Sequence, residues 1–223
     1  MASFDHPVHE FLCDRLRVRS GQVLVDLGCG AGATLVAAAR RFLGVHLVGY
    51  DERAADLELA RRHLGPGPVL EVVDLDGLLP LDDASVDAVV SHNLIECLAD
   101  PVRLMNETAR VLLPGGSAVW SHTDFDTVVT NTADVELSRR ILHSYADAAQ
   151  PWMRHADPRM GRKLAGLVRH SHLQLVAAEA HTVVCLRNDR AERRRAVCRC
   201  RPVRAQRAHR TAVRRRAGAA ERD

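Results

Sequence analysis

The sequence contains no apolar run that approaches the roughly 20 residues needed by a membrane-spanning helix, so no transmembrane segment is predicted. The first six residues, Met-Ala-Ser-Phe-Asp-His, lack a basic start followed by an apolar core, so we expect no signal peptide. The six cysteines follow no repeated spacing. This predicts reduced thiols in a cytoplasmic protein, with neither a disulfide framework nor a metal site.

Lysine is almost absent: Lys163 is its single occurrence, and arginine supplies the other basic side chains. Residues 1–186 carry 17 basic and 24 acidic side chains, a net charge of −7, whereas residues 187–223 carry 14 and 4, a net charge of +10. The formal net charge of +3 therefore conceals an acidic body and a basic tail. An acidic body does not favour a nucleic acid as the partner.

Apolar strands alternate with helical segments in a chain whose 223 residues suit one domain. The expected strands are 23–27, 45–50, 69–73, 86–91 and 117–121, and the expected helices are 4–16, 33–42, 52–64 and one that starts at Pro101 with Asp100 as its N-cap. Pro114, Gly115 and Gly116 form an expected turn before the last of these strands. The alternation predicts an α/β fold, a doubly wound and mostly parallel sheet with both faces covered.

Residues 122–160 interrupt this alternation and are expected to form a helical lid over the ends of the sheet. A helix is expected near 134–149, and its Tyr145, with Trp152 beyond it, is expected to pack in the core of the lid, or alternatively against an aromatic substrate. A further helix at 164–170 and a strand-like stretch at 173–184 follow.

The first strand ends in an acid and runs into three alternating glycines, Val-Leu-Val-Asp-Leu-Gly-Cys-Gly-Ala-Gly at 23–32. Such a loop at a helix N-terminus brings bare backbone close to a ligand. Asp26, two residues before Gly28, suits a cationic ligand with an amino group better than a pyrophosphate. Gly28, Gly30 and Ala33 also satisfy the G-x-G-x-x-A dinucleotide fingerprint, so an NAD(P)-dependent oxidoreductase remains an alternative.

Two further acids follow the second and third strands. Asp51, 19 residues beyond Gly32, can accept hydrogen bonds from ribose hydroxyls, although a helix-capping role is the alternative. Asp74 can accept the amino group of an adenine while the backbone N–H of Leu75 meets a ring nitrogen, and Asp76 is its rival. A solvated loop acid is the alternative for Asp74.

Five motifs fall in a fixed order: the glycine loop, Asp51, Leu-Pro-Leu-Asp-Asp-Ala-Ser-Val-Asp at 79–87, Ser-His-Asn-Leu-Ile-Glu-Cys-Leu at 91–98, and Arg-Val-Leu-Leu-Pro-Gly-Gly at 110–116. Together they resemble a class I S-adenosylmethionine-dependent methyltransferase, of the small-molecule group similar to ubiquinone/menaquinone C-methyltransferases. The resemblance covers about residues 8–184.

The resemblance implies a cofactor, S-adenosylmethionine, and a small-molecule methyl acceptor in a domain at 1–186. The residues that it assigns to the cofactor are Asp26, Gly28, Gly30 and Gly32 at the methionine end, Asp51 at the ribose, Asp74 and Leu75 at the adenine, and Asn93 facing the donor or the substrate. The methyl group is expected to leave the sulfonium by in-line displacement.

A base is needed only where the acceptor carries a proton on the atom to be methylated. The candidates are His92, His122 and Asp126, with Asp124 beside them, because histidine titrates near neutral pH. Surface or capping roles are the alternative for each of these side chains.

The tail at 187–223 changes composition abruptly to arginine and alanine, and no aromatic residue follows Trp152. We expect a disordered basic arm for an acidic partner, or the product of an out-of-frame reading of a GC-rich gene. Metal binding by Cys198, Cys200 and His209 is a third alternative, although C-x-C with one distant histidine is a poor zinc pattern. The seventh, antiparallel strand that the resemblance implies has no convincing counterpart there. A non-catalytic, truncated methyltransferase remnant is therefore a further alternative.

Overall fold

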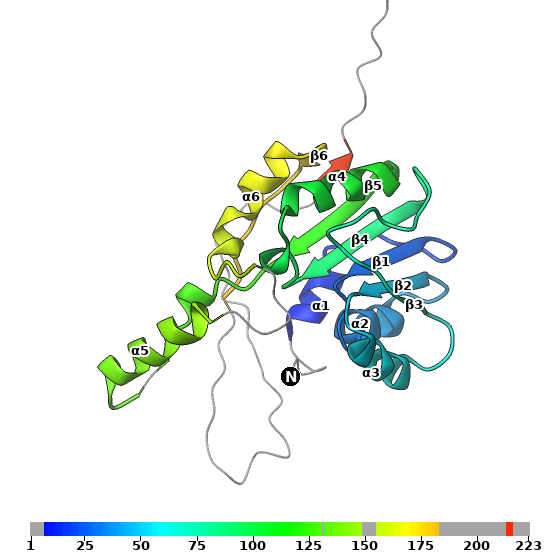
Figure 1. The fold of residues 1–223 in the computed structure, drawn as a ribbon. Helices are drawn as coiled ribbons and strands as arrows, with labels where there is room; N and C mark the ends of the chain where they lie inside the picture. Colours follow the sequence, from blue (N-terminus) through cyan, green and yellow to red (C-terminus); the bar gives the residue numbers. More distant parts are fainter. Residues whose placement is uncertain (1–6, 131, 149–154, 183–212, 216–223) are drawn as a thin grey trace, which may run out of the picture.

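The computed structural model describes residues 7–130, 132–148, 155–182 and 213–215 (Figure 1). Its sheet has seven strands in the order β3-β2-β1-β4-β5-β7-β6. Their bounds are β1 Val23–Leu27, β2 His46–Asp51, β3 Val69–Val72, β4 Val86–His92, β5 Leu112–Ser121, β6 Leu173–Leu175 and β7 Val213–Arg215. Strands β1 to β5 are parallel, and β7 runs antiparallel to both β5 and β6. The predicted doubly wound α/β fold is confirmed.

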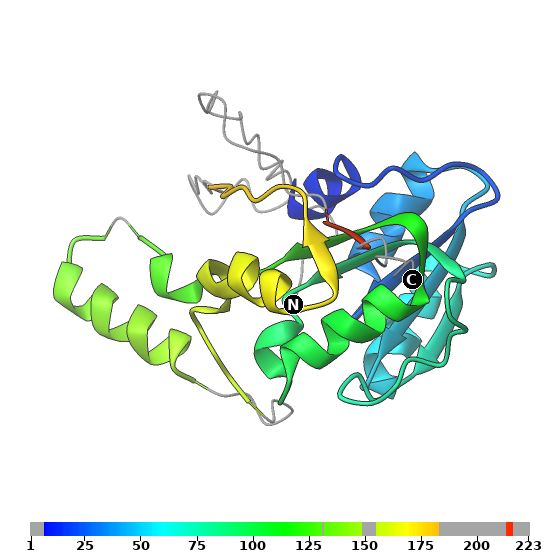
Figure 2. The same cartoon turned by 90° about the horizontal axis from the view of Figure 1, so that it is seen from above.

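Helices cover both faces of the sheet, and Figure 2 shows α1 and α2 on the side opposite α4 and α6. The helices are α1 Pro7–Cys13, α2 Ala33–Arg41, α3 Ala54–Leu64, α4 Pro101–Val111, α5 Val135–Ala146 and α6 Met160–His170, with single 3₁₀ turns η1 Ile95–Cys97 and η2 Phe125–Thr127. Successive residues of β1 point into the hydrophobic cores on opposite faces of the sheet. Leu24 packs in the core formed with α1, α2 and α3, and Val25 packs in the core formed with α4 and α6. This alternation follows from the two-residue period of a strand.

Helix α5 projects from the body (Figures 1 and 2). The helix itself confirms the prediction for 134–149, and Asp134 caps it by accepting a hydrogen bond from the Leu137 N–H. The expected packing of Tyr145 in a lid core is wrong, because Tyr145 is 58% exposed and Ile141, on the same face, is 57% exposed. Trp152 lies outside the described residues.

Strand β5 differs from its prediction at its start. The turn expected at Pro114–Gly116 lies inside the strand, because Leu112 already pairs with Val86 before the register shifts and Ser117 pairs with Ala88. Burial explains the difference: Leu112 has no exposed surface, so it stays in the sheet while the following residues bulge outward, with Gly115 at a φ of +83°.

The carboxyl-terminal strands are shorter than the sequence suggests. Of the stretch expected at 173–184, the structure describes residues 173–182, and within these Leu173–Leu175 forms a strand, β6. The seventh, antiparallel strand is present as Val213–Arg215. The expectations for the rest of the tail at 187–223 concern residues outside the described part of the chain.

Arg110 explains why the motifs at 79–87 and 110–116 occur together. Its guanidinium donates to the carbonyls of Leu79 and Leu81 and to the carboxylates of Asp83 and Glu107. The hydrogen bond from Arg110 holds the pKa of Glu107 below its usual value. Thus one side chain at the end of α4 fixes the loop that leads into β4.

Gly49 of β2 should not tolerate a side chain. A Cβ at this position would lie 2.7 Å from Leu35 Cδ1 and from Leu70 Cδ2, and 2.9 Å from Cys29 Sγ. Since overpacking of a core typically costs about 1–3 kcal/mol, Gly49→Ala should lower the free energy of unfolding by that amount in urea titrations. The matched control is Gly166→Ala in α6, where a Cβ would meet no atom of the described chain within 4 Å beyond its own stretch of helix. This variant should gain about 0.5–1 kcal/mol from the better helix former. Equal effects of the two substitutions would contradict the packing of β2 described above.

Candidate functional site

The glycine loop is held by the end of β2. The N–H groups of Gly28 and Cys29 both donate to the carbonyl of Tyr50, over 2.8 and 3.0 Å. The N–H of Gly30 donates over 2.8 Å to Oδ2 of Asp51. Three successive amides of the loop are therefore fixed by two successive residues of the neighbouring strand, which places Asp51 directly against the loop.

Bare backbone faces open space at Gly30. Its φ is +51°, and a Cβ built there would meet no atom of the described residues within 4 Å, its two chain neighbours aside. Gly28 and Gly32 also have positive φ, but their added Cβ atoms would lie 3.0 Å from Leu94 and 3.1 Å from Ala60. Gly30 is therefore the place in the loop where a ligand can approach the backbone, and Gly32 is the N-cap residue of α2 behind it.

Asp26 is a buried acid with an unsatisfied oxygen. Its side chain lies at the end of β1, the residue is 2% exposed, and none of the described residues gives Oδ2 a hydrogen bond. Burial, and then the nearby charge of Asp51, raise the pKa of Asp26 well above its usual value. A buried carboxyl of this kind is stabilised by a cation, because burying an unpaired charge is costly.

Acidic side chains also gather beyond β2 and β3. Oxygen atoms of Glu52, Asp74 and Asp76 lie within 4.8 Å of one another. Asp74 accepts a hydrogen bond from the Asp76 N–H, and Asp76 accepts one from the Ala99 N–H, which ties this loop to the start of α4. The side chain of Leu75 lies in the core, so only its backbone is available to a ligand.

The ends of β4 and β5 are clamped together by Asn93. This residue has a φ of +54°, its Oδ1 accepts from the Thr123 N–H over 2.7 Å, and its Nδ2 donates to the Thr123 hydroxyl over 3.3 Å. Its neighbour His92 contacts the Ser121 hydroxyl over 3.2 Å. The amide of Asn93 thus serves the protein scaffold, and its predicted place facing the donor or substrate stays a prediction.

His122 has a partner that the sequence analysis did not single out. Its Nε2 lies 3.3 Å from Oε2 of Glu96 in η1, and the side chains of His122 and Glu96 are 0% and 7% exposed. An acid within the apolar run Leu-Ile-Glu-Cys-Leu at 94–98 is the signal that could have revealed it, because such an acid is rarely buried without a partner.

Asp124 and Asp126 are engaged in ion pairs with α6 and the residue before it. Asp124 accepts two hydrogen bonds from Arg162, and Asp126 accepts from Arg159 and Arg162. The hydrogen bond from Arg159 lowers the pKa of Asp126. Asp126 is therefore a weaker proton acceptor than an unpaired carboxylate.

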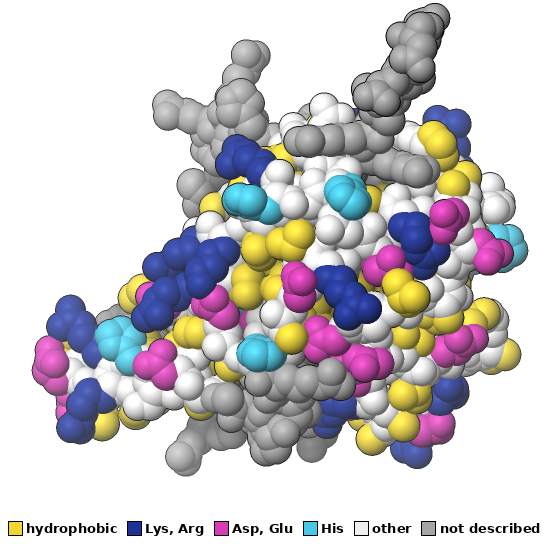
Figure 3. All heavy atoms as spheres, turned by 45° about the horizontal axis from the view of Figure 1, so that its top comes forward, with side chains coloured by type: hydrophobic (Ala, Val, Ile, Leu, Met, Phe, Trp, Pro, Cys, Tyr) yellow, Lys and Arg dark blue, Asp and Glu magenta, His cyan; other side chains and the backbone are white. Residues whose placement is uncertain are grey.

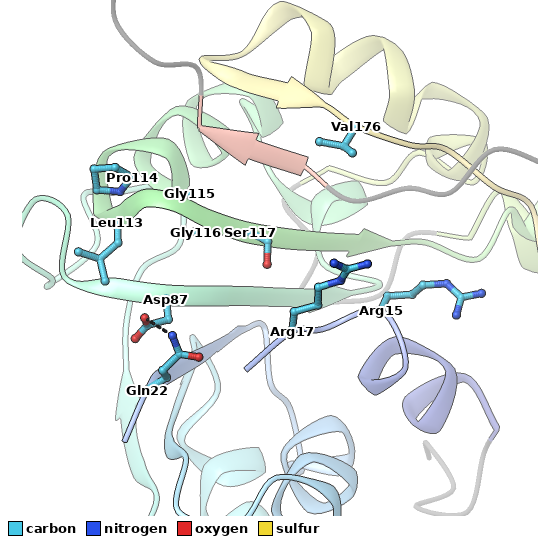
Figure 4. Close-up of a pocket in the computed structure, with 10 residues that line it drawn as sticks. All are labelled: Arg15, Arg17, Gln22, Asp87, Leu113, Pro114, Gly115, Gly116, Ser117 and Val176. Carbon is cyan, nitrogen blue, oxygen red and sulfur yellow. Dashed lines mark hydrogen bonds between the residues drawn. The ribbon is translucent and has the colours of Figure 1, made fainter. Parts of the chain in front are cut away.

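A cavity of about 390 Å³ lies at the opposite, amino ends of the strands (Figure 4). Its lining residues come from the start of β5, the start of β4 and the segment before β1, including Ser117, Asp87 and Gln22. Arg15 and Arg17, labelled in Figure 4, also line it. Since the glycine loop follows β1 at its carboxyl end, this cavity is separate from the ligand site inferred above.

None of the described helices is both long and apolar enough to cross a membrane. On the face shown in Figure 3, the projecting arm at the lower left carries side chains of both charges together with hydrophobic ones.

The described cysteines, Cys13, Cys29 and Cys97, are free thiols. Burial raises the pKa of Cys13 and of Cys97 to about 12, so neither is a reactive thiolate at neutral pH.

Comparison with known proteins matches residues 25–120 to the family described as "Methyltransferase domain". An uncharacterized 37.1 kDa protein of a Streptomyces fradiae transposon is 33% identical over 139 residues, which cover 61% of this chain and 40% of that protein. The demethylmenaquinone methyltransferase of Clavibacter sepedonicus is 33% identical over 133 residues, which cover 59% of this chain and 51% of that protein. The chain thus spans about half, or less, of the length of these relatives.

A solved structure supports the architecture. In the complex between the Trm112 methyltransferase activator and a methyltransferase from Haloferax volcanii, the matching chain aligns with a TM-score of 0.60 at 23% identity, covering 79% of this chain and 72% of that chain. The likeness concerns the fold, and it agrees with the doubly wound sheet described above.

The raised pKa of Asp26 has a consequence for stability. An acid whose pKa is higher in the folded chain than its unfolded value of 3.8 destabilises the fold progressively as the pH rises above that value. The side chain in Asp26→Asn cannot ionise. The melting temperature of this variant minus that of the wild type should therefore increase as the pH is raised from about 4 to about 8. The control is Asp14→Asn, an exposed acid paired with Arg41. Melting curves that stay parallel for the wild type and Asp26→Asn at every pH would refute a protonated, buried Asp26.

Proposed function

We propose that the chain transfers the methyl group of S-adenosylmethionine to a small-molecule acceptor. The premise is that residues 25–120 belong to the class I S-adenosylmethionine-dependent methyltransferases, as the sequence predicted. The proposal includes the predicted limits of the domain, 1–186, with 122–160 as the lid. It also includes a cytoplasmic location, in keeping with the free thiols of Cys13, Cys29 and Cys97.

The observation that carries the proposal is the unsatisfied, buried carboxyl of Asp26, which lies near the charge of Asp51, the acceptor of the Gly30 N–H. S-adenosylmethionine brings an ammonium group and a sulfonium, so it supplies the positive charge that this carboxyl lacks. A dinucleotide brings a pyrophosphate instead, which a charged Asp26 would repel. The residues present therefore fit the methyltransferase cofactor and disfavour the oxidoreductase alternative.

The remaining contacts follow from the ends of the strands. Asp51 already accepts the Gly30 N–H on Oδ2 and the Arg53 N–H on Oδ1, and each carboxylate oxygen can accept a second hydrogen bond, here from a ribose hydroxyl. We assign the adenine amino group to Asp74 and a ring nitrogen to the backbone N–H of Leu75. These roles keep the predicted order of the sites along β1, β2 and β3.

When bound, the cofactor supplies an electrophilic methyl group. The chain has to align an acceptor with it and exclude water, and such positioning can contribute roughly 7–11 kcal/mol at best. The acidic body of residues 1–186, with a net charge of −7, favours a small metabolite over a nucleic acid as the acceptor. The demethylmenaquinone methyltransferase among the relatives has a name consistent with this class.

Ligand-induced stabilisation tests the proposal directly. S-adenosylhomocysteine at ~100 times its dissociation constant should stabilise the folded protein by about 2.7 kcal/mol, seen as a higher melting temperature, whereas NAD should leave it unchanged. Asp51→Asn should weaken binding roughly 10- to 100-fold, since hydrogen bonds to a charged group contribute about 1.5–3 kcal/mol. Asp14→Asn, an exposed acid on the segment after α1, should bind like the wild type.

The outcomes separate the candidate functions. A shift with NAD alone would replace the proposal by the oxidoreductase. A cooperative melt that neither ligand changes would mean a folded protein without either site, which is the non-catalytic remnant. Equal affinity of wild type and Asp51→Asn for S-adenosylhomocysteine would remove Asp51 from the cofactor site.

A further inference from the structure

The cavity at the amino ends of the strands lies away from the proposed cofactor site and is lined by side chains of both charges (Figure 4). Arg15 and Arg17 precede β1, and Asp87 is the second residue of β4. The volume of about 390 Å³ falls within the range of roughly 300–1,000 Å³ that is typical of small-molecule sites. The cavity therefore suits a ligand of the size of one small metabolite.

Two of the three charged side chains on the cavity wall have no counter-ion. Arg15 forms an ion pair with Glu179, whereas Arg17 has no ion-pair partner among the described residues. Asp87 has none among them either, because its two oxygens accept hydrogen bonds from neutral groups, the Gln22 side chain and the first N–H of β1. A cation and an anion that line one cavity without pairing with each other can each bind the opposite charge of a ligand.

The remaining wall combines apolar side chains with accessible backbone. Leu113, Pro114 and Val176 contribute apolar surface, and Val176 is 49% exposed. At Gly115, which has a φ of +83°, an added Cβ would meet no atom of the described residues within 4 Å, its two chain neighbours aside. Ser117 supplies a hydroxyl that can donate or accept a hydrogen bond. The cavity can thus cover an apolar group of a ligand and leave room beside the backbone of β5.

We propose that this cavity binds a free α-amino acid with an apolar side chain. The carboxylate of the amino acid pairs with the guanidinium of Arg17, whose fork of N–H donors matches two carboxylate oxygens. The ammonium group pairs with Asp87, since each oxygen of a carboxylate can accept a second hydrogen bond. The apolar side chain packs against Leu113, Pro114 and Val176. Both uncompensated charges of the wall are satisfied together, which neither a simple anion nor a simple amine would achieve.

Amide chemical shifts of the full-length, ¹⁵N-labelled protein test the site and its location. Titration with L-leucine should shift the amide signals of Gly115, Gly116 and Ser117 and leave those of Gly28 and Gly30 unchanged. The matched probes are L-leucinamide, which lacks the carboxylate, and 4-methylpentanoate, which lacks the ammonium group. Each probe should bind about 10- to 100-fold more weakly than L-leucine, because it loses one charge-assisted pair.

Two substitutions separate the contributions of the two charges. Arg17→Gln should weaken the binding of L-leucine about 10- to 100-fold and abolish the preference for L-leucine over L-leucinamide. Asp87→Asn should instead abolish the preference for L-leucine over 4-methylpentanoate. The matched controls are Arg19→Gln and Asp82→Asn, which change exposed side chains outside the cavity and should bind L-leucine like the wild type.

The comparison of the three probes on the wild-type protein decides the question even if Asp87→Asn does not fold, because Asp87 also fixes the start of β1. Equal affinity for L-leucine and 4-methylpentanoate would make the cavity an anion site, and equal affinity for L-leucine and L-leucinamide would make it an amine site. Either result would overturn the proposal.

The location of the shifts provides a further check. Unchanged signals of Gly115 and Ser117 at every concentration of L-leucine, L-valine and L-phenylalanine would overturn the proposal. Shifts at Gly28 and Gly30 alone would also overturn it, because they would place the amino acid at the glycine loop. None of these results depends on the binding of S-adenosylmethionine, so the proposed function is tested separately.

Discussion

The three hydrogen bonds from the glycine loop to the end of β2 are the constraint on which the ligand site depends. They exist only because β1 and β2 pair in parallel, with Asp26 beside Gly49 and Leu27 beside Tyr50, so that both strands end at the same level. Gly49 lets β2 approach Cys29 and Leu35 closely enough for this pairing. The cofactor contacts proposed for Asp51 and Gly30 are therefore consequences of strand register rather than of the loop sequence alone.

That arrangement places acids where a folded chain would otherwise avoid them. Asp26 is buried beside the charge of Asp51, and the fold without ligand is less stable for it at neutral pH. A positively charged ligand removes this destabilisation by supplying the missing charge. The free energy of unfolding is thus lower without the ligand and rises when the ligand binds. Cofactor affinity is therefore coupled to the protonation of the Asp26 carboxyl.

The sequence predicts best those features that local chemistry determines. The limits of β1, the capping of α4 by Asp100 and the loop around Gly30 follow from nearby residues, and the structure agrees with them. The exposure of Tyr145 and the inclusion of Pro114 in β5 depend on which surfaces the rest of the chain covers, so periodicity could not predict them. Likewise, Glu96 becomes notable only when β5 brings His122 to it.

A second buried pair of ionisable side chains depends on strand register in the same way. Glu96 and His122 face each other over 3.3 Å beyond the ends of β4 and β5, and Asn93 holds the two segments together through the N–H of Thr123. Because an isolated buried charge costs several kcal/mol, neither side chain would be stable as an ion there without the other. The pairing of β4 with β5 therefore fixes this contact, as the pairing of β1 with β2 fixes the glycine loop.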